Sequence, residues 1–239
     1  DLGFPIIRND KLNITVYAQA AKMLGKTQDP DTGDEEPLGI GLIPFGVSSW
    51  FGPLHFIFEY RSIPEGRFEF SYWNRLYEIE RVSFLRNNSN QVVLRTKESQ
   101  LGKFGDQNGY FSRVSLDVGA FFEANMAYNN MVGSLWSNDD KKFIMEKNQT
   151  FLTSLKLTKS ISRIQSASAF YQQRNVPNPF KFKYTESTII GCRLGIFMGQ
   201  GLVLNYIFRR TFRDYNANGR IDGNAETIDI TSIETSFTF

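Results

Sequence analysis

Apolar and polar residues alternate one by one in many short segments of this chain. The segment RVSLDV at residues 113–118 is a clear example, and LNITVYAQA at 12–20 and LVLNYIFR at 202–209 follow the same rule. Successive side chains of a β-strand point to opposite faces, so this period of two predicts strands with one apolar and one polar face. Because no helical period of 3.6 is sustained, the sequence predicts an all-β protein.

Twelve segments carry this strand signal, and we expect them to form one domain over residues 1–239. The predicted strands are 12–23, 38–47, 54–61, 67–73, 82–95, 110–121, 124–134, 151–159, 165–174, 188–198, 202–213 and 227–239. Most connections between them alternate between a tight turn and a long polar loop. An even number of strands would place both ends of the domain on the same side of a membrane.

The longest uncharged stretch, residues 37–57, could cross a bilayer by length, but its prolines and glycines argue against a spanning helix. A closed antiparallel β-barrel is the other structure that a bilayer permits, because closure pairs every backbone group. Short turns alternating with long loops are typical of bacterial outer-membrane barrels, with turns in the periplasm and loops outside the cell. A soluble β-sandwich would share the strand alternation but has no reason to alternate its loop lengths.

The end of the chain and its aromatic content point to the same architecture. Phe, Tyr and Trp make up 15% of the chain, and aromatic girdles of membrane barrels would use such an excess. The last segment, ETSFTF, completes a set of alternating residues on one face: Ile233, Thr235, Phe237 and Phe239. In this strand and in its architecture the chain resembles the Gram-negative outer-membrane β-barrels. The resemblance implies an integral outer-membrane protein in the lipid bilayer, whose last strand is recognised by the barrel-assembly machinery.

Ten ionisable residues of the predicted strands would point into such a barrel. They are Glu59, Arg61, Arg67, Glu69, Arg113, Asp117, Lys156, Arg193, Arg209 and Glu234. A dry interior does not tolerate so many charges without pairing. Either the lumen is hydrated and its six basic groups favour anionic solutes, or ion pairs plug it. We therefore predict a passive channel for small anionic solutes; the alternative is a plugged structural or assembly barrel that binds partner proteins through its loops.

Composition gives little support to other classes of function. The formal net charge is +2 and no run of Lys or Arg is present, so we expect no nucleic-acid partner. The single Cys192 excludes an intramolecular disulfide. An outer-membrane hydrolase would need a histidine and a serine on the lipid face, whereas the only histidine, His55, is predicted to face inward. We therefore expect that the chain is not an enzyme.

The segment DYNANGRID at residues 214–222 has the spacing of a calcium-binding loop. Its oxygen ligands would be the side chains of Asp214, Asn216, Asn218 and Asp222 and the carbonyl of Arg220. The twelfth position holds Ala225, and the acidic Glu226 comes one residue late, which predicts weak affinity. The alternative is a plain hairpin loop, because Asn-Gly is by itself a strong turn signal. We expect no other cofactor.

Overall fold

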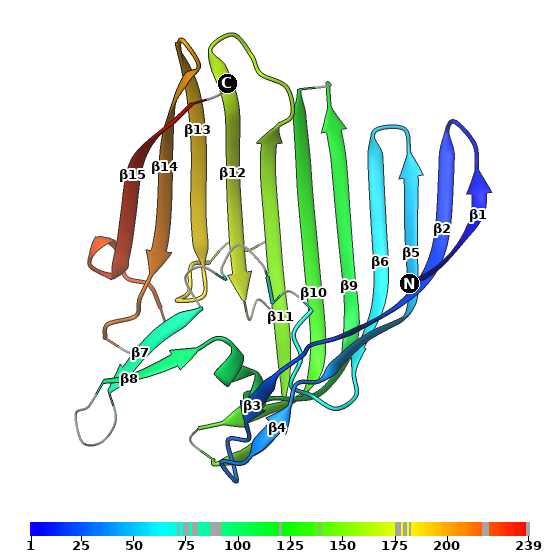
Figure 1. Ribbon diagram of the computed structural model, residues 1–239, viewed down its shortest axis with the longest axis vertical. Coiled ribbons are helices and arrows are strands. Elements are labelled where there is room, and N and C mark those ends of the chain that lie inside the picture. The colour runs from blue at the N-terminus through cyan, green and yellow to red at the C-terminus, as the bar shows by residue number, and fades with distance from the viewer. Residues whose placement is uncertain are drawn as a thin grey trace.

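Eleven antiparallel strands form one large sheet in the computed structural model of the chain (Figure 1). The structure describes all residues except 71, 74–76, 78–80, 87–91, 120, 139, 175–177, 179–180, 182, 217–219 and 238–239. The sheet strands are β1 (Leu2–Arg8), β2 (Leu12–Lys22), β5 (Ile40–Phe51), β6 (Leu54–Ile63), β9 (Phe104–Val118), β10 (Phe122–Ser137), β11 (Lys142–Leu157), β12 (Ile164–Arg174), β13 (Ile189–Gly199), β14 (Leu202–Phe212) and β15 (Thr227–Phe237). They lie side by side in chain order, so the all-β prediction is confirmed.

The two faces of the sheet differ in polarity, as the alternation predicts. The outer face exposes large apolar side chains, among them Met145 (72%), Ile233 (67%) and Met198 (61%). The inner face carries Glu59 and Arg61. Within the described residues, no helix combines the length and the apolar character needed to span a membrane.

Tight turns and long loops lie at opposite ends of the strands. Residues 9–11, 52–53, 119–121 and 200–201 form tight connections at one end, called the turn end. Residues 23–39, 64–103, 175–188 and 213–226 are the long connections at the other end, called the loop end. The predicted long loop between β10 and β11 is the exception. These two strands continue as a paired hairpin to Ser137 and Lys142, because Trp136 and Phe143 form a cross-strand aromatic pair there.

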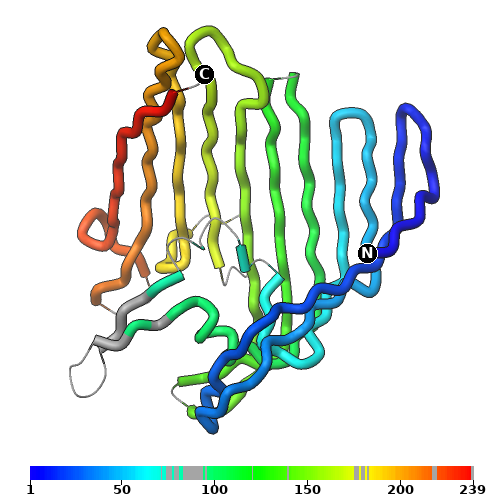
Figure 2. Tube along the Cα trace, in the orientation of Figure 1, coloured from blue at the N-terminus to red at the C-terminus, as the bar shows by residue number. Residues whose placement is uncertain are grey.

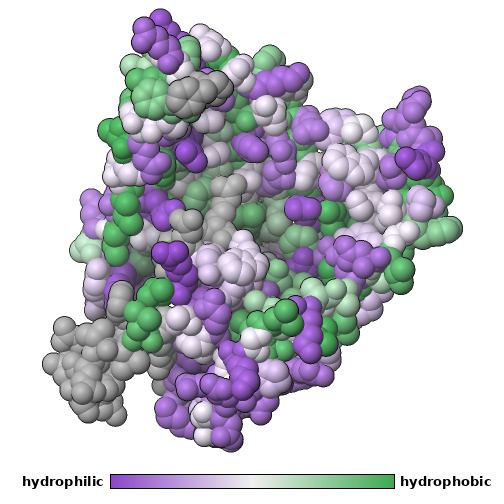
Figure 3. Space-filling model, in the orientation of Figure 1, coloured by the Kyte–Doolittle hydropathy of each residue, from purple (hydrophilic) through white to green (hydrophobic). Residues whose placement is uncertain are grey.

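The longest connection, residues 64–103, packs against the inner face and is called the insert here. It contains a hairpin of β7 (Val82–Arg86) and β8 (Val92–Thr96), followed by the short helix η1 (Glu98–Lys103). A second hairpin, β3 (Lys26–Gln28) with β4 (Glu35–Pro37), contacts η1. Thr27 Oγ1 donates a hydrogen bond of 3.0 Å to the carbonyl of Glu98. Figure 3 shows hydrophilic side chains over the β3–β4 hairpin at the lower end of the molecule.

Two of the twelve predicted strands are wrong. The described residues of 67–73 form no strand, because Phe68 packs onto the inner face instead of joining the sheet. Residues 82–95 do not form one sheet strand but contribute to the separate β7–β8 hairpin, whose strands flank the polar run at 87–91. Conversely, β1 was not predicted: its Pro5 interrupts the alternation, and its register with β2 shifts between Pro5 and Ile7. Ten predicted strands and β1 make the eleven-stranded sheet.

The strands β1 and β15 are the two edges of this sheet (Figure 2). Within the described residues, β1 and β15 do not pair with each other. Eleven successive antiparallel strands leave the first and the last parallel, so β1 and β15 both run toward the turn end. The described sheet therefore has eleven strands instead of the predicted twelve, and closure into a barrel stays a prediction.

Candidate functional site on the inner face

Three strands bring a hydrogen-bonded polar group together on the inner face. The Tyr17 hydroxyl donates to Glu59 Oε1 at 2.7 Å, and Arg61 Nε donates to Glu59 Oε2 at 2.7 Å. The side chains of Glu59 and Arg61 are each only 10% exposed. Arg61 also donates to Asn129 Oδ1 at 3.3 Å, and its guanidinium lies 3.8 Å from the centre of the Phe111 ring. Glu59 and Arg61 thus lie on the inner, polar face of the sheet and form a buried ion pair. That this face lines a lumen stays a prediction.

The insert covers this part of the inner face with aromatic side chains. Phe68 is 5% exposed and packs with Ile63 and Met131. A Cβ atom at Gly41 would lie 2.1 Å from the Phe68 ring, so only glycine leaves room for the ring there. The strand predicted over residues 67–73 would have turned Phe68 to the face opposite Arg67 and Glu69, and that prediction is wrong. Its apolar surface is instead buried between β5, β6 and β10.

A second buried ionic group ties the insert to the wall of the sheet. Glu69 receives a hydrogen bond of 2.9 Å from Arg174 Nη2, at the loop end of β12. Lys97 Nζ lies 3.6 Å from Glu69 and donates to the carbonyl of Tyr72 at 2.7 Å. Burial raises the pKa of the Tyr72 phenol. Glu69, predicted to lie on a strand, therefore lies in the insert as a bridge between two cations.

Arg67 also differs from its predicted place on a strand. It lies in the insert with a φ angle of 53°, in the left-handed region. Its Nε donates to the carbonyl of Pro37 at 2.8 Å, and its Nη1 lies 3.9 Å from Glu36. The side chain therefore contacts the end of the β3–β4 hairpin. The prediction of an inward-pointing wall residue is wrong for Arg67, because the chain leaves the sheet after Ile63.

The remaining predicted inward charges lie on parts of the inner face that the insert leaves uncovered. This open area comprises the charged residues Arg113, Asp117, Lys156, Arg193, Arg209 and Glu234, all exposed except Arg209, which is half-buried. Their strand registers place them on the same face as Asn125 and Asn205. Among the described residues, no side-chain hydrogen bond or ion pair reaches any of these six. The open area therefore holds four cationic and two anionic groups that are accessible to water.

His55 forms a small cluster on the inner face near the turn end. Its Nε2 lies 2.9 Å from Ser48 Oγ, and its ring stacks on Trp50 with centroids 3.8 Å apart. His55 shares the sheet face of Glu59 and Arg61, and its predicted direction into a lumen stays a prediction. A serine and a histidine are in contact, but the cross-strand neighbour of His55 on β9 is Ser115, so that position supplies no carboxylate to orient the ring. Ser48 and His55 therefore form a serine–histidine pair to which β9 adds no acidic third member at this position.

The last strand has the predicted faces. Ile233, Thr235 and Phe237 pair with Tyr206, Leu204 and Leu202 on β14, and all six residues belong to the outer face. Glu234 lies on the opposite face, opposite Asn205. Phe239 lies outside the described residues. Recognition of this strand by an assembly machinery stays a prediction.

The predicted calcium loop is organised by the residue that follows it. Glu226 is 3% exposed, and its two carboxylate oxygens accept hydrogen bonds from the backbone amides of Tyr215 (3.2 Å) and Asp222 (2.6 Å). Asn218 lies outside the described residues. In the part of the chain that the structure describes, no three His, Cys, Asp or Glu side chains are grouped as metal ligands. Calcium binding stays a prediction, and the present role of Glu226 is to close the loop.

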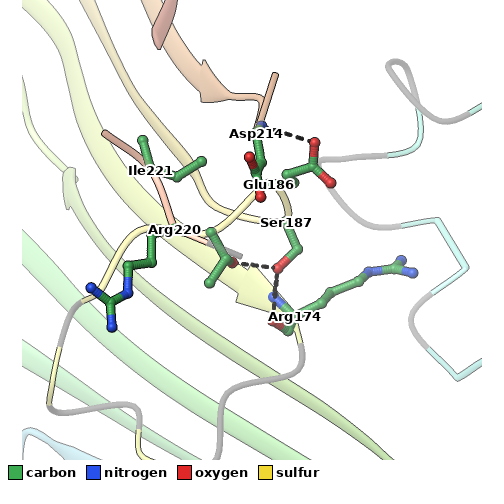
Figure 4. A pocket seen from close by; sticks show the side chains of 7 residues that line it. Arg174, Glu186, Ser187, Asp214, Arg220 and Ile221 are labelled. Carbon is green, nitrogen blue, oxygen red and sulfur yellow. Dashed lines mark hydrogen bonds between the residues drawn. The ribbon is translucent and has the colours of Figure 1, made fainter. Parts of the chain in front are cut away.

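A cavity of about 340 Å³ lies between this loop and the connection after β12 (Figure 4). The backbone amide of Asp214 donates to Glu186 Oε1 at 3.0 Å across it. Figure 4 shows the guanidinium groups of Arg174 and Arg220 pointing in opposite directions, away from Asp214. Arg174 is already bonded to Glu69. The two cations therefore do not converge on one ligand in this cavity.

No protein-family model matches the chain, and no curated protein sequence matches it.

Proposed function

We propose that this chain forms the wall of an integral outer-membrane β-barrel that conducts small anionic solutes, with the insert restricting its lumen. The observation that carries the proposal is the contrast between the faces of the sheet. The outer face exposes apolar side chains from β6 to β15, such as Phe56, Val114 and Ile233. In water this surface would be costly, whereas in a bilayer it would lie against hydrocarbon.

A bilayer also requires that the two sheet edges be paired, because each unpaired backbone group in hydrocarbon costs a free energy on the order of several kcal/mol. Closure of β1 onto β15 would meet this requirement through one parallel seam. Single cysteines at Phe4 and at Thr231, Ile233 or Thr235, in a Cys192→Ser background, would test the seam in membranes. Efficient cross-linking of one pair supports direct closure. Absence of every cross-link in folded protein would contradict it.

Orientation can be tested separately from closure. The loops at the loop end should lie outside the cell, and the turns at the turn end should lie in the periplasm. Single cysteines at Asp34 and Ser162, again with Cys192→Ser, should differ in labelling by an impermeant maleimide in intact cells. Labelling at position 34 alone supports the proposed orientation. Labelling at position 162 alone would reverse it.

Conduction is the central test of the proposed function. The exposed cations of the open area should concentrate anions in a hydrated lumen, because fixed wall charges set the local counter-ion concentration. We expect the purified protein to give small, anion-selective conductance in planar bilayers. Conductance should rise when residues 64–103 are replaced by a short Gly-Ser linker. Arg113→Gln, Arg193→Gln and Arg209→Gln together should shift the reversal potential toward cations.

A second function, a plugged barrel that anchors surface loops or partner proteins, is favoured by the buried Glu69 bridge to Lys97 and Arg174. These contacts hold the insert in place at the loop end of the sheet. The conductance experiment separates the two functions. A folded, inserted protein that conducts neither with nor without the insert would overturn the channel and support the plugged barrel.

A further inference from the structure

Two arginines lie next to each other on the inner face without a counter-charge. Arg193 on β13 pairs in register with Ile207, and Arg209 on β14 pairs with Gly191. The two arginines are therefore diagonal neighbours on one face, with Cβ atoms about 7–8 Å apart by ordinary sheet geometry. Within the described residues, neither guanidinium has a hydrogen bond or an ion pair.

The neighbouring strands add polar groups and one further cation at the same level. Arg193 pairs in register with Ser168 on β12, and Ser168 pairs with Lys156 on β11. Arg193 and Lys156 thus flank Ser168, about 10 Å apart across two strand spacings. The Ser168 hydroxyl has no hydrogen-bond partner in the described part of the chain. The long side chains of Arg193 and Lys156 can therefore meet over Ser168.

The acidic groups of the inner face do not neutralise this pair. Glu123 is the residue opposite Lys156, and its Oε1 accepts a hydrogen bond of 2.8 Å from Asn125. Glu234 lies opposite Asn205, on the turn-end side of Arg209. Glu59 is already paired with Arg61, and Glu69 with Lys97 and Arg174. The pair of arginines therefore keeps an excess of positive charge.

We infer that Arg193 on β13 and Arg209 on β14, with Ser168 on the adjoining strand β12, form a binding subsite for a carboxylate or phosphate oxyanion carried by a small solute. Guanidinium groups suit this chemistry because their fixed fork can donate two hydrogen bonds to one oxyanion. A bound oxyanion would also relieve the repulsion between two like charges on neighbouring strands. The inference rests on the proposed function, since it requires the inner face to be an aqueous lumen.

The subsite can be tested by binding, independently of conduction. Protein refolded in detergent is heated with sodium phosphate, sodium acetate or sodium chloride at equal ionic strength, and unfolding is followed by gel mobility. A ligand that binds only the folded state raises the unfolding temperature. We expect a larger rise in phosphate or acetate than in chloride, and the larger of the two identifies the preferred oxyanion.

Variants assign the effect to the two arginines. Arg193→Gln and Arg209→Gln should each weaken oxyanion binding about tenfold, because one charge-assisted interaction is lost. Arg209→Lys should retain more binding than Arg209→Gln, since it keeps the charge but loses the fork. Arg163→Gln, in the turn between β11 and β12, removes the same charge elsewhere and should bind as the unmodified protein does. Folding of each variant is checked by its heat-modifiable mobility.

The outcomes separate this subsite from the channel. A protein that conducts but shows no rise beyond chloride would overturn the subsite and leave the channel intact. A protein that binds phosphate through these arginines but does not conduct would keep the subsite and overturn the channel. Equal loss of binding in Arg163→Gln would show a general charge effect and would also overturn the subsite.

Discussion

The inner face of this sheet has two regions that differ in the burial and the pairing of their charged side chains. Where the insert contacts the sheet, Glu59, Arg61 and Glu69 are nearly inaccessible to water, and each has an ionic partner at 2.6–2.9 Å. In the open area, Arg193 and Glu234 are exposed and have no such partner in the described residues. The two alternatives predicted from the sequence, ion pairs that plug the interior and exposed charges in water, therefore describe different regions of one surface.

Breaking the buried Glu59–Arg61 ion pair should lower the folding stability more than any other change proposed here. Glu59→Gln would leave the Arg61 guanidinium buried without its carboxylate. Removing one partner of a buried pair costs about 3–5 kcal/mol of folding stability. Urea unfolding of the protein in detergent should therefore show a much lower midpoint for Glu59→Gln. A change below about 0.5 kcal/mol, typical of surface substitutions, would mean that water reaches this pair and that the two regions are alike.

An arginine placed on each face of β15 in turn should distinguish the polar inner face from the apolar outer face. Ile233→Arg would put a cation against hydrocarbon, at a cost of about 2–4 kcal/mol near the bilayer midplane. Ser236→Arg, on the inner face of the same strand, should assemble with little loss. Heat-modifiable mobility of the membrane fraction compares the two variants. Normal assembly of Ile233→Arg with failure of Ser236→Arg would mean that the faces are exchanged.

The packing of the insert can be tested at a single glycine. Gly41→Ala would force the Phe68 ring from its site, and overpacking of this kind costs about 1–3 kcal/mol. The expected result is lower stability and, if the barrel conducts, a higher conductance. Phe68→Ala in the same chain should remove most of the overpacking effect, because the clash is then absent. If the changes in unfolding free energy caused by Gly41→Ala and Phe68→Ala simply add in the double variant, residues 41 and 68 are not in direct contact.

The smallest effect is expected in the open area. Asp117→Asn should change the free energy of unfolding by less than about 0.5 kcal/mol, since the carboxylate is exposed and has no described ionic partner. It should nevertheless increase anion preference, because it removes a negative wall charge. Reversal potentials in a salt gradient measure this. A large loss of stability would show that Asp117 is paired in solution.

Much of the wall was predictable because its faces are decided by neighbours in the sequence. Residues i and i+2 of a strand share a face whatever the strand pairs with. The common face of Glu59, Arg61 and His55 and the common face of Ile233 and Phe237 follow from that rule alone. The hydrophobic alternation also placed ten of the sheet strands.

Other features depended on partners that are distant in the sequence. Phe68 and Phe70 alternate with Arg67 and Glu69 as a strand would, and this local pattern does not reveal that the segment leaves the sheet. Its place depends on the space at Gly41, and the bridge of Glu69 depends on Arg174, 105 residues away. Likewise β1 became a strand only through its register with β2, despite Pro5.

Which side chains share a face follows from the order of the amino acids, because alternation is a property of the extended backbone. Which inner-face charges are paired, and which can meet a solute, depends on contacts between segments that are distant in the chain. The position of the insert decides this. Glu69 and Arg61 are buried where the insert contacts the sheet, and buried charges require partners. Arg193 and Arg209 lie beyond the insert and stay in contact with water.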